Sequence, residues 1–189
     1  MIEFRDLTAE EIEVRVQSIK VKDGKPAGIV LLLYKDARCD MKILDETVGP
    51  ENWEREHYEC KGNLYCKVGI HCQLKNGEFG WVYKSDCGVE SNTDAQKGEA
   101  SDSFKRACFN WGIGRELYTS PFIWVSPDKC NTYDTGRKDA RGNPIFATND
   151  RFAVEKIKIE NKKITAISII NTSIKTEEMK DKRCFICQN

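Results

Sequence analysis

The chain has 189 residues and a formal net charge of zero. This length allows one domain with a substantial core, and the apolar run from Gly28 to Tyr34 is far shorter than the roughly 20 residues that span a bilayer. A neutral total argues against indiscriminate binding to nucleic acid. Segment 1–11 is acidic and lacks the basic and apolar regions of a signal peptide, so we expect a cytoplasmic protein.

The charges are distributed unevenly along the chain. Residues 1–90 contain 13 basic and 17 acidic side chains, residues 91–150 contain 8 of each, and residues 151–189 contain 9 basic and 5 acidic ones. This asymmetry favours head-to-tail attraction between subunits or a local basic groove. The alternative for most of these charges is a solvated surface.

Nine cysteines are unusual for this length. Their odd number and the absence of an export signal argue against a disulfide framework. Cys184 and Cys187 have half the spacing of a zinc site, but no second pair completes it, so we predict no metal site. We expect Cys60, Cys66 and Cys72 to be small core residues of a half-buried sheet.

The N-terminal part predicts two helices around one strand. Thr8 begins a capping box with Glu11, ahead of a short helical stripe over 12–19, although the valines in that stripe leave a strand open. Residues 28–34 have the length of a buried strand. A second helix is predicted from an N-cap at Asp36 to Gly49-Pro50.

Three strands are predicted next, over 53–60, 64–74 and 79–89. The second alternates strictly, so its even-numbered residues share one face and its odd-numbered residues the other. Asn76-Gly77 is a strong hairpin signal. The third strand places four side chains on one face: Trp81, Tyr83, Ser85 and Cys87.

The most informative segment is KGEASDSFKRACFNWGIGRELY, residues 97–118. It predicts a long amphipathic helix that ends near Gly112. Lys105 lies beside the apolar stripe and Arg106 about a quarter turn further round. Asp102, four residues before Arg106, favours an ion pair with it. If only one of the two cations binds a phosphate backbone, we expect it to be Lys105.

The last part of the chain predicts a long polar loop and a second hairpin. Residues 126–150 contain several cations and no evident secondary structure. Residues 152–159 and 164–170 alternate around a turn. The predicted class is therefore α+β, with an antiparallel β-β-β-α core and a C-terminal β-hairpin. We assign residues 1–170 to one domain and residues 171–189 to a charged, flexible tail.

Several blocks of this sequence resemble one known family. They are DAR at 36–38, LDETVGPENW at 44–53, KSD at 84–86, KGEASDSFKRA at 97–107, WGIGR at 111–115 and LY at 117–118. Together, in this order and spacing, they resemble the Rad52/22 family of single-strand annealing proteins, in its short bacterial and phage-type form.

This resemblance implies an oligomeric ring of β-β-β-α subunits that binds single-stranded DNA and anneals complementary strands without ATP in recombination and repair. The groove is expected between the sheet and an overhanging hairpin. The resemblance assigns Lys105 and Arg106 to the groove, and Arg38 and Lys42 by approximate position. Four further candidates for DNA contact are Lys67, Lys84, Lys97 and Arg115. The acidic neighbour Glu116 departs from the family pattern.

Strand annealing breaks no covalent bond, so we expect no enzymatic activity, no catalytic residue and no cofactor. The protein must neutralise phosphates and leave the base edges free. Aromatic residues such as Tyr65, Trp81 or Tyr83 could stack on bases, although core or interface roles are commoner. The expected partners are single-stranded DNA, further copies in a ring or open helix, and a single-strand-binding protein or exonuclease. No membrane partner is expected, and the setting is a bacterial or phage-infected cell, near the nucleoid.

Three other classes of protein are weaker alternatives. A metal-dependent nuclease would need clustered carboxylates; Asp86, Glu90 and Asp94 are near one another in sequence, but they also suit loop and N-cap positions. An NTPase lacks its phosphate-binding loop motif. A non-catalytic oligomeric interaction or structural protein is the main alternative, and a steep salt dependence of DNA binding would separate the two.

Overall fold

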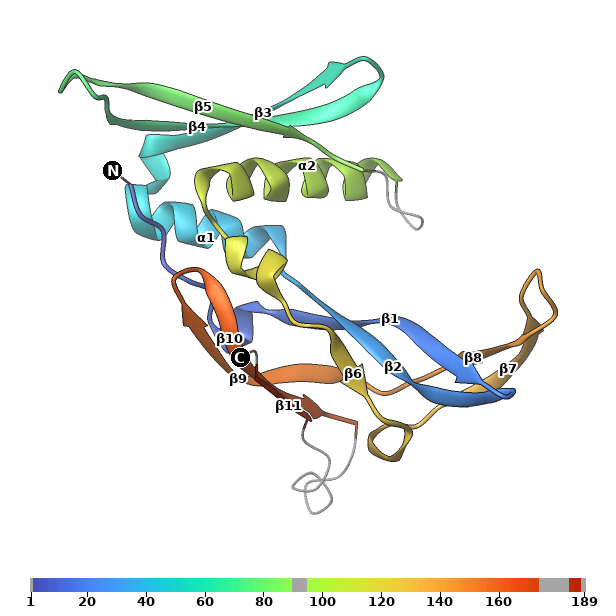
Figure 1. The fold of residues 1–189 in the computed structure, drawn as a ribbon. Helices are drawn as coiled ribbons and strands as arrows, with labels where there is room; N and C mark the ends of the chain where they lie inside the picture. Colours follow the sequence, from blue (N-terminus) through green and yellow to red (C-terminus); the bar gives the residue numbers. More distant parts are fainter. Residues whose placement is uncertain (1, 90–94, 174–183, 188–189) are drawn as a thin grey trace. The chain divides into compact units, whose positions relative to one another are not determined.

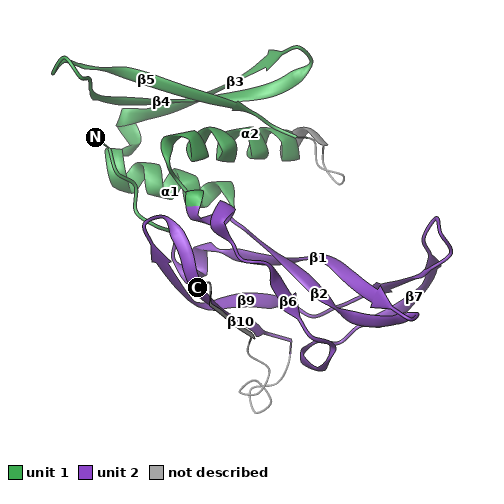
Figure 2. Ribbon diagram, in the orientation of Figure 1, with its two compact units in different colours: residues 1–6, 36–115 green, residues 7–35, 116–189 purple. Residues whose placement is uncertain are grey.

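The computed structural model describes residues 2–89, 95–173 and 184–187, with side chains at 2–89 and 98–173. Its order of elements, drawn in Figure 1, confirms the predicted α+β class. The chain forms two compact units, shown in Figure 2. Unit 1 comprises residues 1–6 and 36–115, and unit 2 comprises residues 7–35 and 116–189.

Unit 1 contains an antiparallel meander, two helices and a short 3₁₀ turn. Strand β4 is central, between β3 and β5. Helix α2 packs against β4 and β5, and α1 packs against α2. The bounds are α1 Ala37–Val48, η2 Pro50–Asn52, β3 Trp53–Cys60, β4 Asn63–Gln73, β5 Phe79–Cys87 and α2 Ala95–Trp111.

The ends of both helices follow from their sequence. The Asp36 side chain caps α1 by accepting a hydrogen bond from the backbone N–H of Arg38 at 3.1 Å. The helix ends at Gly49, whose φ of 87° is readily adopted by glycine, and Pro50 cannot continue it. Helix α2 likewise ends before Gly112, at φ 107°.

The core of unit 1 lies between the meander and α2. Val68 and Ile70 of β4 are fully buried, as are Phe104 and Ala107 of α2. Burial of Val68, Ile70 and Phe104 stabilises the fold by roughly 1.5–3 kcal/mol for each side chain. The indole N–H of Trp111 also donates to the backbone oxygen of Val68 at 3.0 Å, which fixes the helix on the sheet.

Unit 2 contains a six-stranded sheet and a separate two-stranded hairpin, β7-β8. The sheet has the order β11-β10-β9-β1-β2-β6, and β1 meets β9 at one residue pair, Glu13 with Ala153. The bounds are η1 Ala9–Glu11, β1 Glu13–Lys22, β2 Lys25–Tyr34, η3 Arg115–Thr119, β6 Ile123–Val125, η4 Pro127–Lys129, β7 Tyr133–Lys138, β8 Pro144–Ala147, β9 Phe152–Glu160, β10 Lys163–Asn171 and β11 Cys184–Cys187.

Two expected segments differ in the structure. The capping box of Thr8 and Glu11 is present, but it begins only a 3₁₀ turn, and residues 13–22 are a strand. The β-branched residues of that segment pack better on a pleated sheet, where β1 pairs with β2 along its length. The long loop 126–150, expected to lack secondary structure, contains the hairpin β7-β8.

The three cysteines expected in the core differ in exposure. Cys66 is buried and Cys72 is half-buried, but Cys60 is exposed at the end of β3, so its expected core role is wrong. Within the tail, residues 184–187 form β11 against β10. The side chains of Cys184 and Cys187 and the backbone of residues 174–183 lie outside the described residues. The tail boundary at 171 remains a prediction.

Candidate nucleic-acid interface

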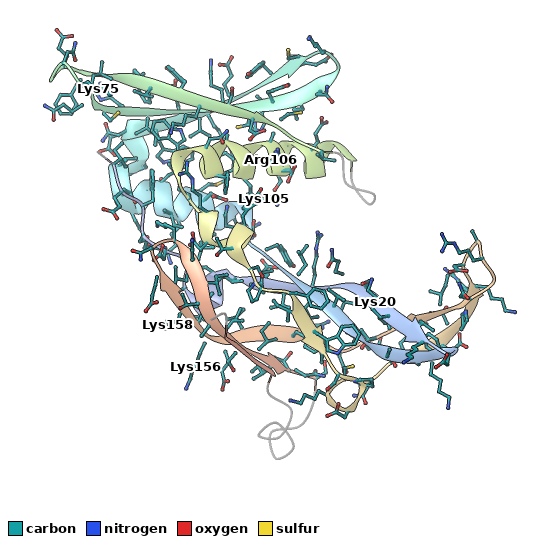
Figure 3. The ribbon with its side chains drawn as sticks, viewed as in Figure 1. Lys20, Lys75, Lys105, Arg106, Lys156 and Lys158 are labelled. Atoms are coloured by element: carbon teal, nitrogen blue, oxygen red, sulfur yellow. The ribbon has the colours of Figure 1, made fainter. Side chains whose placement is uncertain are left out.

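Helix α2 displays the two cations that sequence reasoning ranked first, Lys105 and Arg106, and Figure 3 labels both. Both side chains are half-buried. Within the described residues, Lys105 has no hydrogen-bond or ion-pair partner. Its ammonium group is therefore available to an anion from outside the chain.

Arg106 differs from Lys105 because it is paired inside unit 1. Its Nε lies 3.3 Å from Oδ1 of Asp86 on β5, and Oδ2 of the same carboxylate accepts a hydrogen bond from the Asn110 side chain at 3.2 Å. Asp102, the partner expected from sequence, accepts instead from the backbone N–H of Val89 at 3.1 Å. A phosphate that bound Arg106 would have to compete with Asp86.

Lys84 and Arg115 both bind the C-terminal end of α2. Lys84 Nζ donates to the backbone oxygen of Asn110 at 2.9 Å and lies 4.6 Å from the centre of the Trp111 ring. Arg115 donates to the backbone oxygens of Phe109 and Asn110, each at 3.0 Å. The last carbonyls of a helix lack intrahelical donors and lie at its negative end, so cations stabilise them. Both candidates therefore have a structural role here.

Glu116, which follows Arg115, is directed into unit 2. Its side chain is fully buried, and Oε1 accepts a hydrogen bond from the backbone N–H of Leu7 at 2.7 Å. The other oxygen, Oε2, is buried without a hydrogen-bond partner. The carboxylate therefore anchors the segment before η1, which gives Glu116 a structural role.

Lys67 lies on the face of the meander opposite α2. Its Nζ is 2.6 Å from Oε2 of Glu56 and 5.2 Å from the centre of the Tyr83 ring. The hydrogen bond to Glu56 is the main reason that the pKa of Lys67 is raised above its ordinary value. This cation is held in an internal pair, which reduces its availability for phosphate.

The remaining candidates lie on the helices. Arg38, on α1, is exposed, and its side chain has no hydrogen-bond or ion-pair partner among the described residues. Lys42, one turn later, is exposed and lies 3.7 Å from Glu46. Surface pairs of this kind contribute roughly 0–1 kcal/mol. Lys97 belongs to α2, but its side chain lies outside the described part of the chain.

The meander face opposite α2 exposes a row of aromatic rings, defined here as the aromatic face. The ring centroids of His71 and Trp81 are 5.4 Å apart, and those of Trp81 and Tyr83 are 6.2 Å apart. Phe79, which is 69% exposed, lies beyond them. The sequence analysis did not single it out, although it lies two residues before Trp81 in β5 and therefore on the same face. A Cβ at Gly69 would come within 2.5 Å of the Tyr83 ring, so this glycine makes room for the tyrosine.

Acidic groups accompany the aromatic face. The hydroxyl of Tyr83 donates to Oε1 of Glu54 at 2.9 Å, and this bond is the main reason that the pKa of Tyr83 is raised. Glu56 neutralises Lys67 on the same face. A surface that neutralises phosphates needs more cations than acids, and on the aromatic face the acids Glu54 and Glu56 outweigh Lys67. The cations of α2 therefore suit a DNA backbone better than the aromatic face does.

The part of the chain that the structure describes contains no group of three or more His, Cys, Asp and Glu side chains arranged to hold a metal ion. None of its helices has the length and apolar character needed to cross a bilayer.

Comparison with known proteins adds one finding. Residues 5–135 match a family model described as the Rad52/22 family of double-strand break repair proteins. The match includes α1, the meander and α2 of unit 1, and β1, β2 and β6 of unit 2. Comparison of the sequence with curated proteins gave no significant match.

Proposed function

Because the chain belongs to the Rad52/22 family of double-strand break repair proteins, we propose that it binds single-stranded DNA and anneals complementary strands without ATP. The observation that supports this most directly is Lys105, half-exposed on a helix inside the family match and without a partner among the described residues. Annealing needs no bond chemistry, so a binding surface is sufficient.

In the proposed mechanism, cations on α2 neutralise backbone phosphates, so that two polyanionic strands can approach each other. Lys105 binds directly, because it has no partner among the described residues that would have to be displaced. Arg106 binds by exchanging Asp86 for a phosphate oxygen. Contacts to the backbone leave the base edges free for pairing, and such contacts do not select a sequence.

We also propose that the protein acts as a homo-oligomer, a ring or an open helix. Family membership supports oligomerisation, and the opposite net charges of residues 1–90 and 151–189 favour head-to-tail contact. A single-strand-binding protein or an exonuclease is proposed as a helper partner.

The test is strand annealing without ATP, followed by fluorescence quenching between labelled complementary oligonucleotides. Wild-type protein should accelerate annealing over a no-protein reaction. The double variant Lys105→Ala with Arg106→Ala should keep the oligomer, measured by sedimentation, and lose single-strand binding and annealing. A matched control replaces two exposed lysines elsewhere, Lys75→Ala with Lys163→Ala, and should anneal normally.

Two outcomes would contradict parts of this proposal. If the Lys105 and Arg106 double variant annealed at the wild-type rate, the site would be wrong. If wild-type protein formed oligomers but neither bound nor annealed single strands, the alternative of a non-catalytic interaction protein would replace the annealing function.

A further inference from the structure

Two hairpin ends lie beside each other in unit 2 and enclose a cleft of about 520 Å³. One is the end of the β1-β2 hairpin, where Figure 3 labels Lys20, and the other is the end of β7-β8. Most of β7-β8 lies beyond residue 135, where the family match stops. The cleft is lined by Ile19, Lys20, Val21, Asp23, Gly24, Asp139, Asn143, Pro144, Ile145 and Phe146.

Cations predominate on these two hairpin ends, which we call the two-hairpin surface. Residues 19–25 and 134–146 contain six cations and three acids. All six cations are exposed, and among the described residues their side chains form no hydrogen bonds or ion pairs. They are Lys20, Lys22, Lys25, Arg137, Lys138 and Arg141.

Two of the three acids are used by the backbone of the β7-β8 hairpin. Asp134 accepts a hydrogen bond from the N–H of Gly136 at 2.9 Å. Asp139 accepts from the backbone N–H of Arg141 at 2.8 Å and from both the backbone and the side chain of Asn143, at 2.9 and 3.0 Å. The bonds from Asn143 are the main reason that the pKa of Asp139 is lowered. These acids therefore hold the turn in shape and do not pair with the cations.

The cleft between the hairpins has apolar walls. Val21 and Ile145, one from each hairpin, are each 39% exposed, and Phe146 is half-buried beside them. A ligand for this surface must therefore combine negative charges with flat or apolar groups. A single strand of nucleic acid has both, because its bases are not stacked inside a duplex.

We propose that the two-hairpin surface is a further binding surface for the backbone of single-stranded DNA, formed by residues of unit 2, in addition to the Lys105 and Arg106 pair of α2. The proposal rests on the proposed function for the identity of its ligand. Phosphates contact the cations of both hairpins, and bases lie against the apolar walls of the cleft. A duplex exposes no base faces, so this site favours single strands.

The test measures how the affinity for a fluorescent oligothymidylate changes with salt, by anisotropy. The variant Arg137→Gln with Lys138→Gln and Arg141→Gln removes three cations. Each phosphate contact in a single strand releases about 0.7 counterions, so the loss of three contacts should make the slope of log affinity against log salt about 2 less steep. Affinity at low salt should fall at least about tenfold. The triple variant Lys20→Gln, Lys22→Gln and Lys25→Gln tests the opposite hairpin independently, with the same expected direction.

The control removes the same charge elsewhere, through Lys61→Gln, Lys75→Gln and Lys163→Gln. It should leave the slope nearly unchanged, and an equal fall in the control would overturn the proposal, because the effect would then be one of total charge. Wild-type slopes in both hairpin variants, together with lost binding in the Lys105 and Arg106 variant, would overturn this site alone. If the wild-type protein bound no single strand, or bound acidic polyglutamate instead through the hairpins, both proposals would fall.

Discussion

Three cations of unit 1 and the six cations of the two-hairpin surface in unit 2 differ in what they contact. In unit 1, Lys84 and Arg115 bind the end of α2, and Arg106 pairs with Asp86. On the two-hairpin surface, all six cations lack such partners among the described residues. Position within a recognisable motif and availability for a ligand are therefore separate properties of a cation. The first can be read from sequence, and the second depends on what the fold places nearby.

The largest expected effect tests whether Lys84 is structural. Lys84→Met should lower the free energy of unfolding by about 2 kcal/mol, because it removes a charged donor from the α2 carbonyl of Asn110. Urea denaturation measures this change. Lys138→Met, in the two-hairpin surface, is the matched control and should change stability by less than about 0.5 kcal/mol. Equal effects of the two variants would remove the distinction between the two groups of cations.

A smaller loss is expected at the second cation that binds the end of α2. Arg115→Ala should lower stability by about 1 kcal/mol, since two hydrogen bonds to helix carbonyls are lost but the site is exposed and water can replace them. The same denaturation experiment applies. Affinity for single-stranded DNA, measured on the folded protein, should stay close to wild type. A large loss of affinity at unchanged stability would instead make Arg115 a DNA contact.

A third change should weaken one internal contact of Arg106 and so favour its contact with a ligand. Asp86→Asn removes the carboxylate charge that pairs with Arg106, so affinity for single-stranded DNA should rise about threefold, the size expected for a surface ion pair. Anisotropy titration at low salt measures this change. Adding Arg106→Ala to the variant should abolish the gain in affinity. If the gain persisted, it would come from the change in the net charge of the protein and not from Arg106.

The smallest effect concerns Lys67 and its pKa. The hydrogen bond to Glu56 raises the pKa of Lys67, so the stabilisation is present at neutral pH and is lost as pH rises through the folded-state pKa. Glu56→Gln should lower the pKa of Lys67 toward its ordinary value. A pH titration of the lysine side-chain NMR signals measures it, and an unchanged pKa would mean that the pair does not form in solution.

The sequence predicted the elements whose signals are local. Asp36 and Gly49 mark the ends of α1, and the alternation in β4 separates its two faces. The alternation in β5 placed Lys84 on the face opposite Trp81 and Tyr83, but it could not say which face α2 covers. That choice depends on packing between segments far apart in the chain. It decides that Lys84 binds the helix, whereas Lys67 on the other face pairs with Glu56.

The remaining differences have the same origin. The pairing of Arg106 with Asp86 joins residues 20 apart, whereas the pattern available in sequence was the neighbouring Asp102. The short strands β7 and β8 do not alternate clearly, because β7 is mostly exposed and β8 is mostly half-buried on a separate two-stranded hairpin. Their pairing is specified by the turn that Asp139 organises, which only the structure shows.

The single residue pair between β1 and β9 has a mechanical consequence. Glu13 and Ala153 are the only registered pair that joins strands β1, β2 and β6 to strands β9, β10 and β11 within the described residues. The six-stranded sheet therefore behaves as two smaller sheets connected at a seam. Tension between its two halves would separate the strands at this seam first, and each half would keep its own ladder of hydrogen bonds.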